Sequence, residues 1–154
     1  MDEYEDSMMT QGQTSRRDIL RLGAVAAASA CGGCAILGSR KANVTTEPRQ
    51  GVVRLTNAQS AALLASEGST LVQPTGFHDR ILVVHLTDNT LHAVSAICTH
   101  MGCTVDYGKD TGHITCPCHG SQYALDGSVI RGPAKQPLKR YDVTTENGQV
   151  LIKV

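Results

Sequence analysis

The sequence predicts an all-β domain of short antiparallel strands, preceded by a single helix near the N-terminus. The apolar, β-branched run Ile81–Thr87 and the alternating run Leu91–Ile97 are separated by the turn pair Asp88-Asn89, which is typical of a hairpin. The turn dipeptides Asp126-Gly127 and Asn147-Gly148 also have apolar flanks. The chain has 154 residues, enough for one domain of ordinary size with length to spare.

Shorter elements complete the predicted domain, which begins near Gly51. Val52–Leu55 and Leu71–Gln73 have the composition of strands. The sequence Thr56-Asn57-Ala58-Gln59 resembles a capping box and predicts a short helix over Ala61–Ala65. The last two strands are expected at Arg140–Thr145 and Gln149–Val154.

Composition limits both the partners and the size of the core. Lys plus Arg and Asp plus Glu each number 14, so no basic excess indicates a nucleic-acid partner. The chain has no Trp, one Phe and four Tyr. A domain of about a hundred residues with so few aromatic side chains has a small core, and a disulfide or a bound metal centre would help to stabilise it.

Two cysteine and histidine boxes carry the chemistry. The first reads C-T-H-M-G-C over Cys98–Cys103, and the second reads C-P-C-H-G-S over Cys116–Ser121. Together they supply two cysteine–histidine pairs and two further cysteines. This inventory suits a two-iron cluster in which imidazoles replace two thiolates. A tetrahedral zinc ion is the alternative, but zinc leaves Cys103 and Cys118 without a role.

Both boxes resemble those of the Rieske [2Fe–2S] family. The run C-P-C-H-G-S-Q-Y, followed by R-G-P-A, resembles in particular the high-potential Rieske subunits of cytochrome bc and cytochrome bf complexes. The resemblance implies a Rieske fold of stacked sheets over residues 51–154, one [2Fe–2S] cluster, and a cluster-binding part at about residues 95–135.

The resemblance also assigns roles to individual residues. It implies that Cys98 and Cys116 bind one iron, that His100 and His119 bind the other, and that a disulfide joins Cys103 to Cys118. It further implies that the hydroxyls of Ser121 and Tyr123 hydrogen-bond a bridging sulfide and a cysteine sulfur. Gly132, Pro133 and Ala134 resemble the proline loop that covers the cluster. A structural disulfide favours an oxidising compartment.

Mixed ligation and hydroxyl donors both favour a high reduction potential. Neutral imidazoles in place of thiolates remove negative charge, so an added electron costs less. The hydroxyl donors stabilise that electron further. The resemblance implies that the two imidazoles reach the surface, where His119 contacts quinol and His100 is the second exposed ring. At this contact, quinol would give its proton to a ligand imidazole and its electron to the cluster iron.

The first 50 residues predict export and membrane attachment. Residues 1–14 are polar and are expected to be disordered. The run S-R-R-D-I-L-R over Ser15–Arg21 resembles a twin-arginine signal, and the apolar stretch Leu22–Gly38 follows it. We expect residues 15–40 to remain as a membrane anchor. Cleavage, or lipid attachment at Cys31 of the C-G-G-C pair Cys31–Cys34, are the alternatives. Residues 41–50 are expected to be a flexible tether.

Together these features predict the iron–sulfur subunit of a quinol-oxidising complex, with no turnover of its own. Its partners would be quinol, a cytochrome b-type protein, the membrane and a c-type cytochrome or plastocyanin-like acceptor. We expect the domain formed by residues 51–154, the head, to lie on the periplasmic face of a bacterial cytoplasmic membrane. Two alternatives remain: the Rieske small subunit of a periplasmic molybdenum oxidase of the arsenite oxidase type, and a stand-alone Rieske electron carrier.

Overall fold

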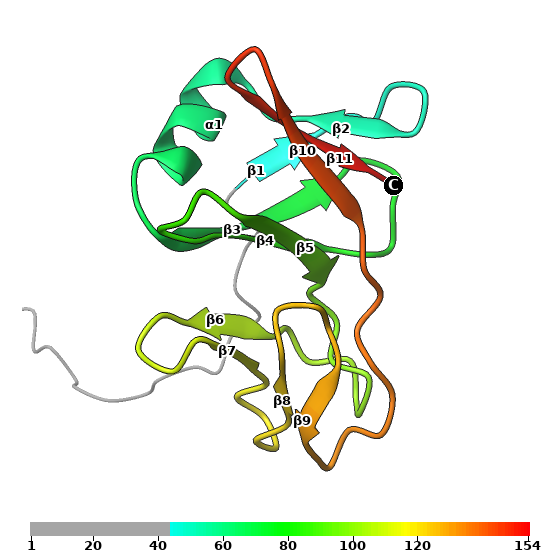
Figure 1. Ribbon diagram of the computed structural model, residues 1–154. Helices are drawn as coiled ribbons and strands as arrows, with labels where there is room; N and C mark the ends of the chain where they lie inside the picture. The colour runs from blue at the N-terminus through cyan, green and yellow to red at the C-terminus, as the bar shows by residue number, and fades with distance from the viewer. Residues whose placement is uncertain (1–43) are drawn as a thin grey trace, which may run out of the picture. The chain divides into compact units, whose positions relative to one another are not determined.

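The computed structural model describes residues 44–154, which form three small sheets and one helix (Figure 1). The first sheet has the order β1-β3-β4-β5 and the second the order β10-β11-β2, while β6-β7-β8-β9 form the third. The strands of the first sheet are β1 (Val44–Thr46), β3 (Gly68–Pro74), β4 (Ile81–His85) and β5 (Leu91–Ser95). Those of the second are β2 (Val52–Arg54), β10 (Asp142–Glu146) and β11 (Gln149–Lys153). Those of the third are β6 (Asp106–Gly108), β7 (His113–Thr115), β8 (Gln122–Tyr123) and β9 (Val129–Arg131).

The predicted all-β class is confirmed for these residues. Every strand pair is antiparallel except β1 with β3, which is parallel. The expected hairpins are present, with β4 followed by β5, β8 by β9, and β10 by β11. Asn89 and Asn147 take positive φ angles in two of their turns, as asparagine tolerates better than most residues.

Strand β4 divides the domain into two cores. All five of its residues are buried, and successive side chains point to opposite faces of the sheet. Ile81 and Val83 enter a core shared with the second sheet. Leu82 and Val84 enter a core shared with the third sheet, which contains Tyr123. Strand β4 therefore contributes one face to each core, and the second core also contains Cys98 and Cys116, the first residues of the two boxes.

Helix α1 (Asn57–Leu64) begins at the predicted capping box. The Oγ1 atom of Thr56 accepts from the N–H of Gln59 at 3.3 Å, and the N–H of Thr56 donates to the Gln59 side chain at 2.8 Å. The helix starts four residues before the expected Ala61. The buried hydroxyl of Ser60 accepts from the N–H of Val150 at 3.0 Å, which fixes the helix on β11.

One predicted boundary is wrong. Residues 44–46 lie in the range expected for the flexible tether, yet they form β1 beside Val72–Pro74 of β3. Val44 is 6% exposed and packs into the core that contains Val53. The ordered domain therefore begins before Gly51. Polar composition concealed this edge strand, because a parallel partner and one buried valine are enough to hold it.

The remaining N-terminal predictions concern residues outside the described range. These are the disordered residues 1–14, the signal or anchor at residues 15–40, the cysteines Cys31 and Cys34, and residues 41–43 of the tether. Within residues 44–154, no helix has the length and apolar character needed to cross a bilayer.

Candidate metal centre

The two predicted boxes fold into equivalent turns. In the loop Cys98–Cys103, the N–H of the first residue donates to the carbonyl of the sixth at 2.8 Å, and the N–H of the fifth donates to the carbonyl of the first at 2.8 Å. In the loop Cys116–Ser121, the same two bonds measure 2.8 and 3.0 Å. The fifth residue, Gly102 or Gly120, has a φ of +74°. Each turn thus fixes its first cysteine through that residue's own N–H and carbonyl groups.

The four potential ligands are arranged with sulfur inside and nitrogen outside. Cys98 and Cys116 are 2% and 1% exposed, and each thiol shifts the pKa of the other. His100 and His119 are exposed, with ring centroids 4.8 Å apart and an interplanar angle of 87°. The two thiols from two loops can hold one metal ion on the protein side, while the two imidazoles can hold a second on the solvent side.

A disulfide joins the two loops. It links Cys103 to Cys118, whose Cα atoms are 6.5 Å apart and which are 15 residues apart in sequence. The Sγ atoms of Cys103, Cys118 and Cys116 lie within 4.8 Å of one another. This trio is not a metal site, because a disulfide leaves two of the three sulfurs without thiolate character. The cross-link instead holds the turns together beside the donor set.

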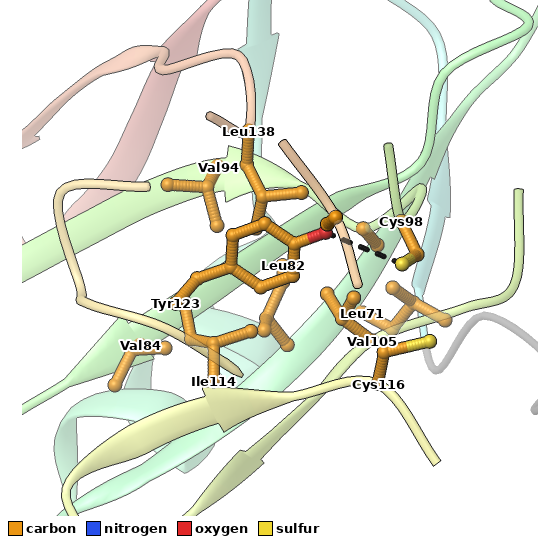
Figure 2. Close-up of a cluster of buried hydrophobic side chains, with 12 residues drawn as sticks. Leu71, Leu82, Val84, Val94, Cys98, Val105, Ile114, Cys116, Tyr123 and Leu138 are labelled. Carbon is orange, nitrogen blue, oxygen red and sulfur yellow. Dashed lines mark hydrogen bonds between the residues drawn. The ribbon is translucent and has the colours of Figure 1, made fainter. Parts of the chain in front are cut away.

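Tyr123 connects the hydrophobic core to the first cysteine. Its ring is completely buried, among side chains that include Leu82 and Ile114 (Figure 2). Its hydroxyl lies 3.2 Å from the Sγ atom of Cys98, as the dashed line in Figure 2 shows. The same oxygen is 3.1 Å from Oγ1 of Thr99 and accepts from the Thr99 N–H at 3.3 Å. Packing of the ring therefore sets the position of a hydroxyl donor at the sulfur.

A third loop lies against both turns. It contains a cis peptide bond between Gly132 and Pro133. The N–H of Ala134 donates to the buried Oγ atom of Ser121 at 3.0 Å, which links the loop to the second turn. Oγ1 of Thr99 donates to the carbonyl of Gln136 at 2.7 Å, which links it to the first. Because Ser121 accepts in this bond, its own proton is free to donate to a group at the site.

The pKa values of the two buried thiols, Cys98 and Cys116, shift in opposite directions. Burial alone raises the pKa of Cys98, but hydrogen bonds from the Tyr123 hydroxyl and from the His100 N–H outweigh it, so this pKa lies below its ordinary value. Burial raises the pKa of the Cys116 thiol, and the influence of the neighbouring Cys98 sulfur raises it further. The protein alone favours one thiolate, and a positive ion between the sulfurs is needed to hold two. The donor set therefore fits an iron–sulfur cluster.

The residues that the resemblance assigned to the cluster site meet at this one place. They are Cys98, His100, Cys103, Cys116, Cys118, His119, Ser121, Tyr123, Gly132, Pro133 and Ala134. Sequence reasoning missed Thr99 and Gln136, and it missed the role of the two glycines. A glycine at position five of both boxes was a readable signal for the turns. No comparable signal marked the Thr99–Gln136 contact, because it joins residues far apart in the chain.

The other four histidines provide a contrast, because none of them lies in either box. His85 is 3% exposed on β4, and its Nδ1 atom donates to the carbonyl of Ser66 at 3.1 Å. His113 lies on β7 and His92 on β5, while His78 precedes β4.

Comparison with known proteins identifies close relatives. A family model, the Rieske [2Fe-2S] domain, matches residues 58–142. The cytochrome b6-f complex iron-sulfur subunit of Chlorobaculum tepidum is 45% identical over 76 residues, which cover 49% of this chain and 41% of that protein. The chloroplastic subunit of Bigelowiella natans is 47% identical over 73 residues, which cover 46% of this chain and 29% of that protein. The match thus spans less than half the length of either relative.

Solved structures share the same architecture. The plasma membrane Rieske protein PetC3 from Synechocystis PCC 6803 has 33% sequence identity and a TM-score of 0.51, covering 56% of this chain and 87% of that one. The ferredoxin of carbazole 1,9a-dioxygenase from Nocardioides aromaticivorans IC177 has a TM-score of 0.55 at 22% identity, covering 67% of this chain and 97% of that one. Because the sequence identity to this ferredoxin is only 22%, the similarity shows a shared fold and nothing more.

Proposed function

Because this chain belongs to the Rieske [2Fe–2S] domain family, we propose that it is the iron–sulfur subunit of a quinol-oxidising complex. The names of the relatives support this, since they are subunits of cytochrome b6-f complexes. In this role the chain takes an electron and a proton from quinol beside a cytochrome b-type protein. It passes the electron to a c-type cytochrome or a plastocyanin-like acceptor, and it has no turnover of its own.

The ligand roles follow the division between buried sulfur and exposed nitrogen. Cys98 and Cys116 would hold the inner iron, and His100 and His119 the outer one. When bound, a [2Fe–2S] cluster with this ligation supplies one-electron chemistry at high potential. The Cys103–Cys118 disulfide keeps the two turns in place, while the hydrophobic core that contains Tyr123 excludes water from the buried cysteine sulfurs.

The two exposed imidazoles would form the quinol contact. A ring nitrogen without a proton can accept a hydrogen bond from a quinol hydroxyl and then take its proton. We assign this contact to His119, with His100 as the second exposed ring. The edge-to-face packing of the two rings, 4.8 Å between centroids, restricts their orientations and so supports a defined contact.

The proposed localisation rests on the N-terminal sequence. The twin-arginine-like run Ser15–Arg21 fits a protein that crosses the bacterial cytoplasmic membrane already folded with its cluster, leaving the head on the periplasmic face. Residues 15–40 would then remain as the anchor.

The observation that carries the proposal is the pair of hydroxyls at the buried end of the donor set, Tyr123 at Cys98 and Ser121 beneath the third loop. Such donors favour a potential high enough to oxidise quinol. The test uses membranes that contain the full chain. Reduced material should show the paramagnetic signature of mixed sulfur and nitrogen ligation, and quinol should reduce it. A low potential that does not change with pH around neutrality would refute quinol oxidation.

A further inference from the structure

Charge is distributed unevenly over the described domain. Residues 128–141, which include the third loop, contain four basic side chains and no acidic one. The rest of residues 44–154 contains five basic and nine acidic side chains. The domain is thus close to neutral as a whole but has its positive charge gathered in one segment. Such a separation of charge orients a molecule in the field of a partner.

Two of the four cations are already engaged. The Nζ atom of Lys139 lies 4.4 Å from the centroid of the Tyr141 ring. The charge of Arg140 acts on Asp126, whose pKa lies below its ordinary value mainly because of hydrogen bonds from Ser128. Their positive charge is therefore partly compensated within the domain.

The other two cations, Arg131 and Lys135, stand on either side of Gly132–Ala134. Both are exposed, and neither side chain has a salt bridge or hydrogen bond to any residue in 44–154. The bond from Ala134 to Ser121 holds the loop between them against the second turn at 3.0 Å. Arg131 also pairs with Gln122 in the strand register, one residue beyond that turn. The backbone that carries both free cations is thus held beside the metal centre.

The two turns themselves carry no Asp, Glu, Lys or Arg between Ser95 and Val105, or between Cys116 and Leu125. Their surface is instead partly apolar, since Met101, next to His100, is 68% exposed. The uncharged, partly apolar surface of the two turns, with free cations beside it, is suited to a protein partner whose own contact surface is apolar and edged with carboxylates.

We infer that Arg131 and Lys135 form a docking site for a partner with an acidic surface, and that this partner is the protein that takes the electron. The inference rests on the proposed electron-transfer function. Cations beside the cluster raise the rate of encounter with such a protein at low salt, because charges attract over about 30 Å at 0.01 M ionic strength and about 8 Å at 0.15 M. They also set the orientation in which the two cofactors approach.

The test measures oxidation of the cluster-loaded full chain after reduction with dithionite. Stopped-flow mixing uses two soluble c-type cytochromes, one with acidic residues around its haem edge and one with basic residues. The acidic cytochrome should react faster and should lose that advantage as salt is raised. In the double variant R131Q/K135Q, the rate of reaction with the acidic cytochrome at low salt should fall roughly fivefold, and this rate should depend less on salt.

A matched control removes the same charge elsewhere. R49Q/R54Q lies near and on β2, outside the cluster-binding segments, and should leave the rate within about twofold. Small oxidants test the local field without docking: R131Q/K135Q should slow anionic hexacyanoferrate(III) and speed cationic tris(phenanthroline)cobalt(III). Unchanged visible spectra in both variants establish that the cluster is intact.

Three outcomes would overturn the inference. One is an equal loss of rate in the two double variants, and another is a faster reaction with the basic cytochrome. The third is unchanged cytochrome kinetics with weaker binding of R131Q/K135Q to vesicles of anionic phospholipid, which would assign the cations to a membrane surface. Dithionite reduces the cluster without quinol, so this test does not depend on quinol oxidation. If quinol fails to reduce the chain but the salt dependence of its oxidation by the acidic cytochrome remains, only the proposed quinol reaction is refuted.

Discussion

The hydroxyl of Tyr123 lies 3.2 Å from the sulfur of Cys98 and shares its single proton with a second acceptor. That acceptor is Oγ1 of Thr99, 3.1 Å away. Thr99 cannot donate in return while its own proton is directed to the carbonyl of Gln136 at 2.7 Å. The third loop, the first turn and the buried tyrosine are therefore parts of one hydrogen-bond network, and the sulfur receives only part of the phenolic proton.

Tyr123→Phe should lower the reduction potential of the cluster. The variant keeps the buried ring but removes the donor to Cys98, and a hydrogen bond worth about 1 kcal/mol more in the reduced state corresponds to about 40 mV for one electron. Redox titration followed by electron paramagnetic resonance measures the shift. Ser121→Ala should give a separate, additive decrease, because Ser121 bonds to the third loop and not to Cys98. An unchanged potential in Tyr123→Phe would show that its hydroxyl does not donate to the sulfur.

Thr99→Val should raise the potential, by less than the roughly 40 mV expected for the tyrosine. The valine has nearly the same shape but offers no acceptor, so the phenolic proton is left with Cys98 alone. Thr99→Ser keeps the hydroxyl and is the control that should stay near the parent value. In a Tyr123→Phe background the effect of Thr99→Val should vanish. An equal shift in both backgrounds would contradict proton sharing.

Most of the site could be predicted from sequence because its ligands are local. Each turn is a six-residue segment, and residues such as Cys98 and His100 need only their own loop to be recognised. The contact between Thr99 and Gln136 could not be found in this way, since 37 residues separate them and neither residue type is diagnostic. The hairpins were predictable for the same local reason, through turn residues such as Asn89.

The error at Val44 has a different physical origin. A single valine among polar residues does not reveal a strand, and its stability comes from a parallel partner, Val72, that is distant in sequence. The capping box at Thr56 marked the N-terminus of helix α1 correctly. The predicted helical range nevertheless began only at Ala61, because the first helical turn of Asn57-Ala58-Gln59 has little apolar character of its own.

The glycine at the fifth position of each turn should be difficult to replace. Gly102→Ala and Gly120→Ala each place a side chain at a φ of +74°, although no atom lies within 4 Å of the added Cβ. The cost is then purely conformational, about 1–2 kcal/mol of unfolding free energy. Gly68→Ala is a matched control, because Gly68 also has open space but not a positive φ. Urea unfolding measures the difference, and equal effects at Gly68 and Gly102 would argue against backbone strain.

Removing the disulfide should loosen the metal centre without unfolding the rest of the domain. The double variant Cys103→Ser/Cys118→Ser opens a loop of 15 residues, for which the chain-entropy model gives about 3 kcal/mol. The cluster should be lost faster to a chelator, as followed by visible absorbance. Circular dichroism should still report the strands that pack around Val83 and Val53, whose core does not include either cysteine. Cluster loss at the parent rate would mean that the ligands alone hold the two turns.

Tyr141 should make the domain sensitive to alkali. It is 7% exposed, and its hydroxyl donates to Oδ2 of Asp79, whose other oxygen, Oδ1, accepts from Ser95 at 2.7 Å. Burial, and then the bond to the Asp79 carboxylate, raise the pKa of Tyr141 well above its ordinary 10.0. The folded state therefore favours the protonated phenol, so its contribution is complete below pH 10 and is lost as pH rises beyond it. At pH 10.5 the loss should be about 0.8 kcal/mol.

The measurement compares urea midpoints at pH 8.0 and pH 10.5 for the parent and Tyr141→Phe. The variant should be less stable at pH 8.0 by about 1 kcal/mol, because the Asp79 carboxylate loses a donor. It should then lose less stability than the parent between the two pH values. Tyr107, whose pKa burial and Glu67 raise to about 12, contributes a similar loss in both proteins and does not affect the comparison. Identical losses would mean that Tyr141 ionises as readily in the folded domain as in the unfolded chain.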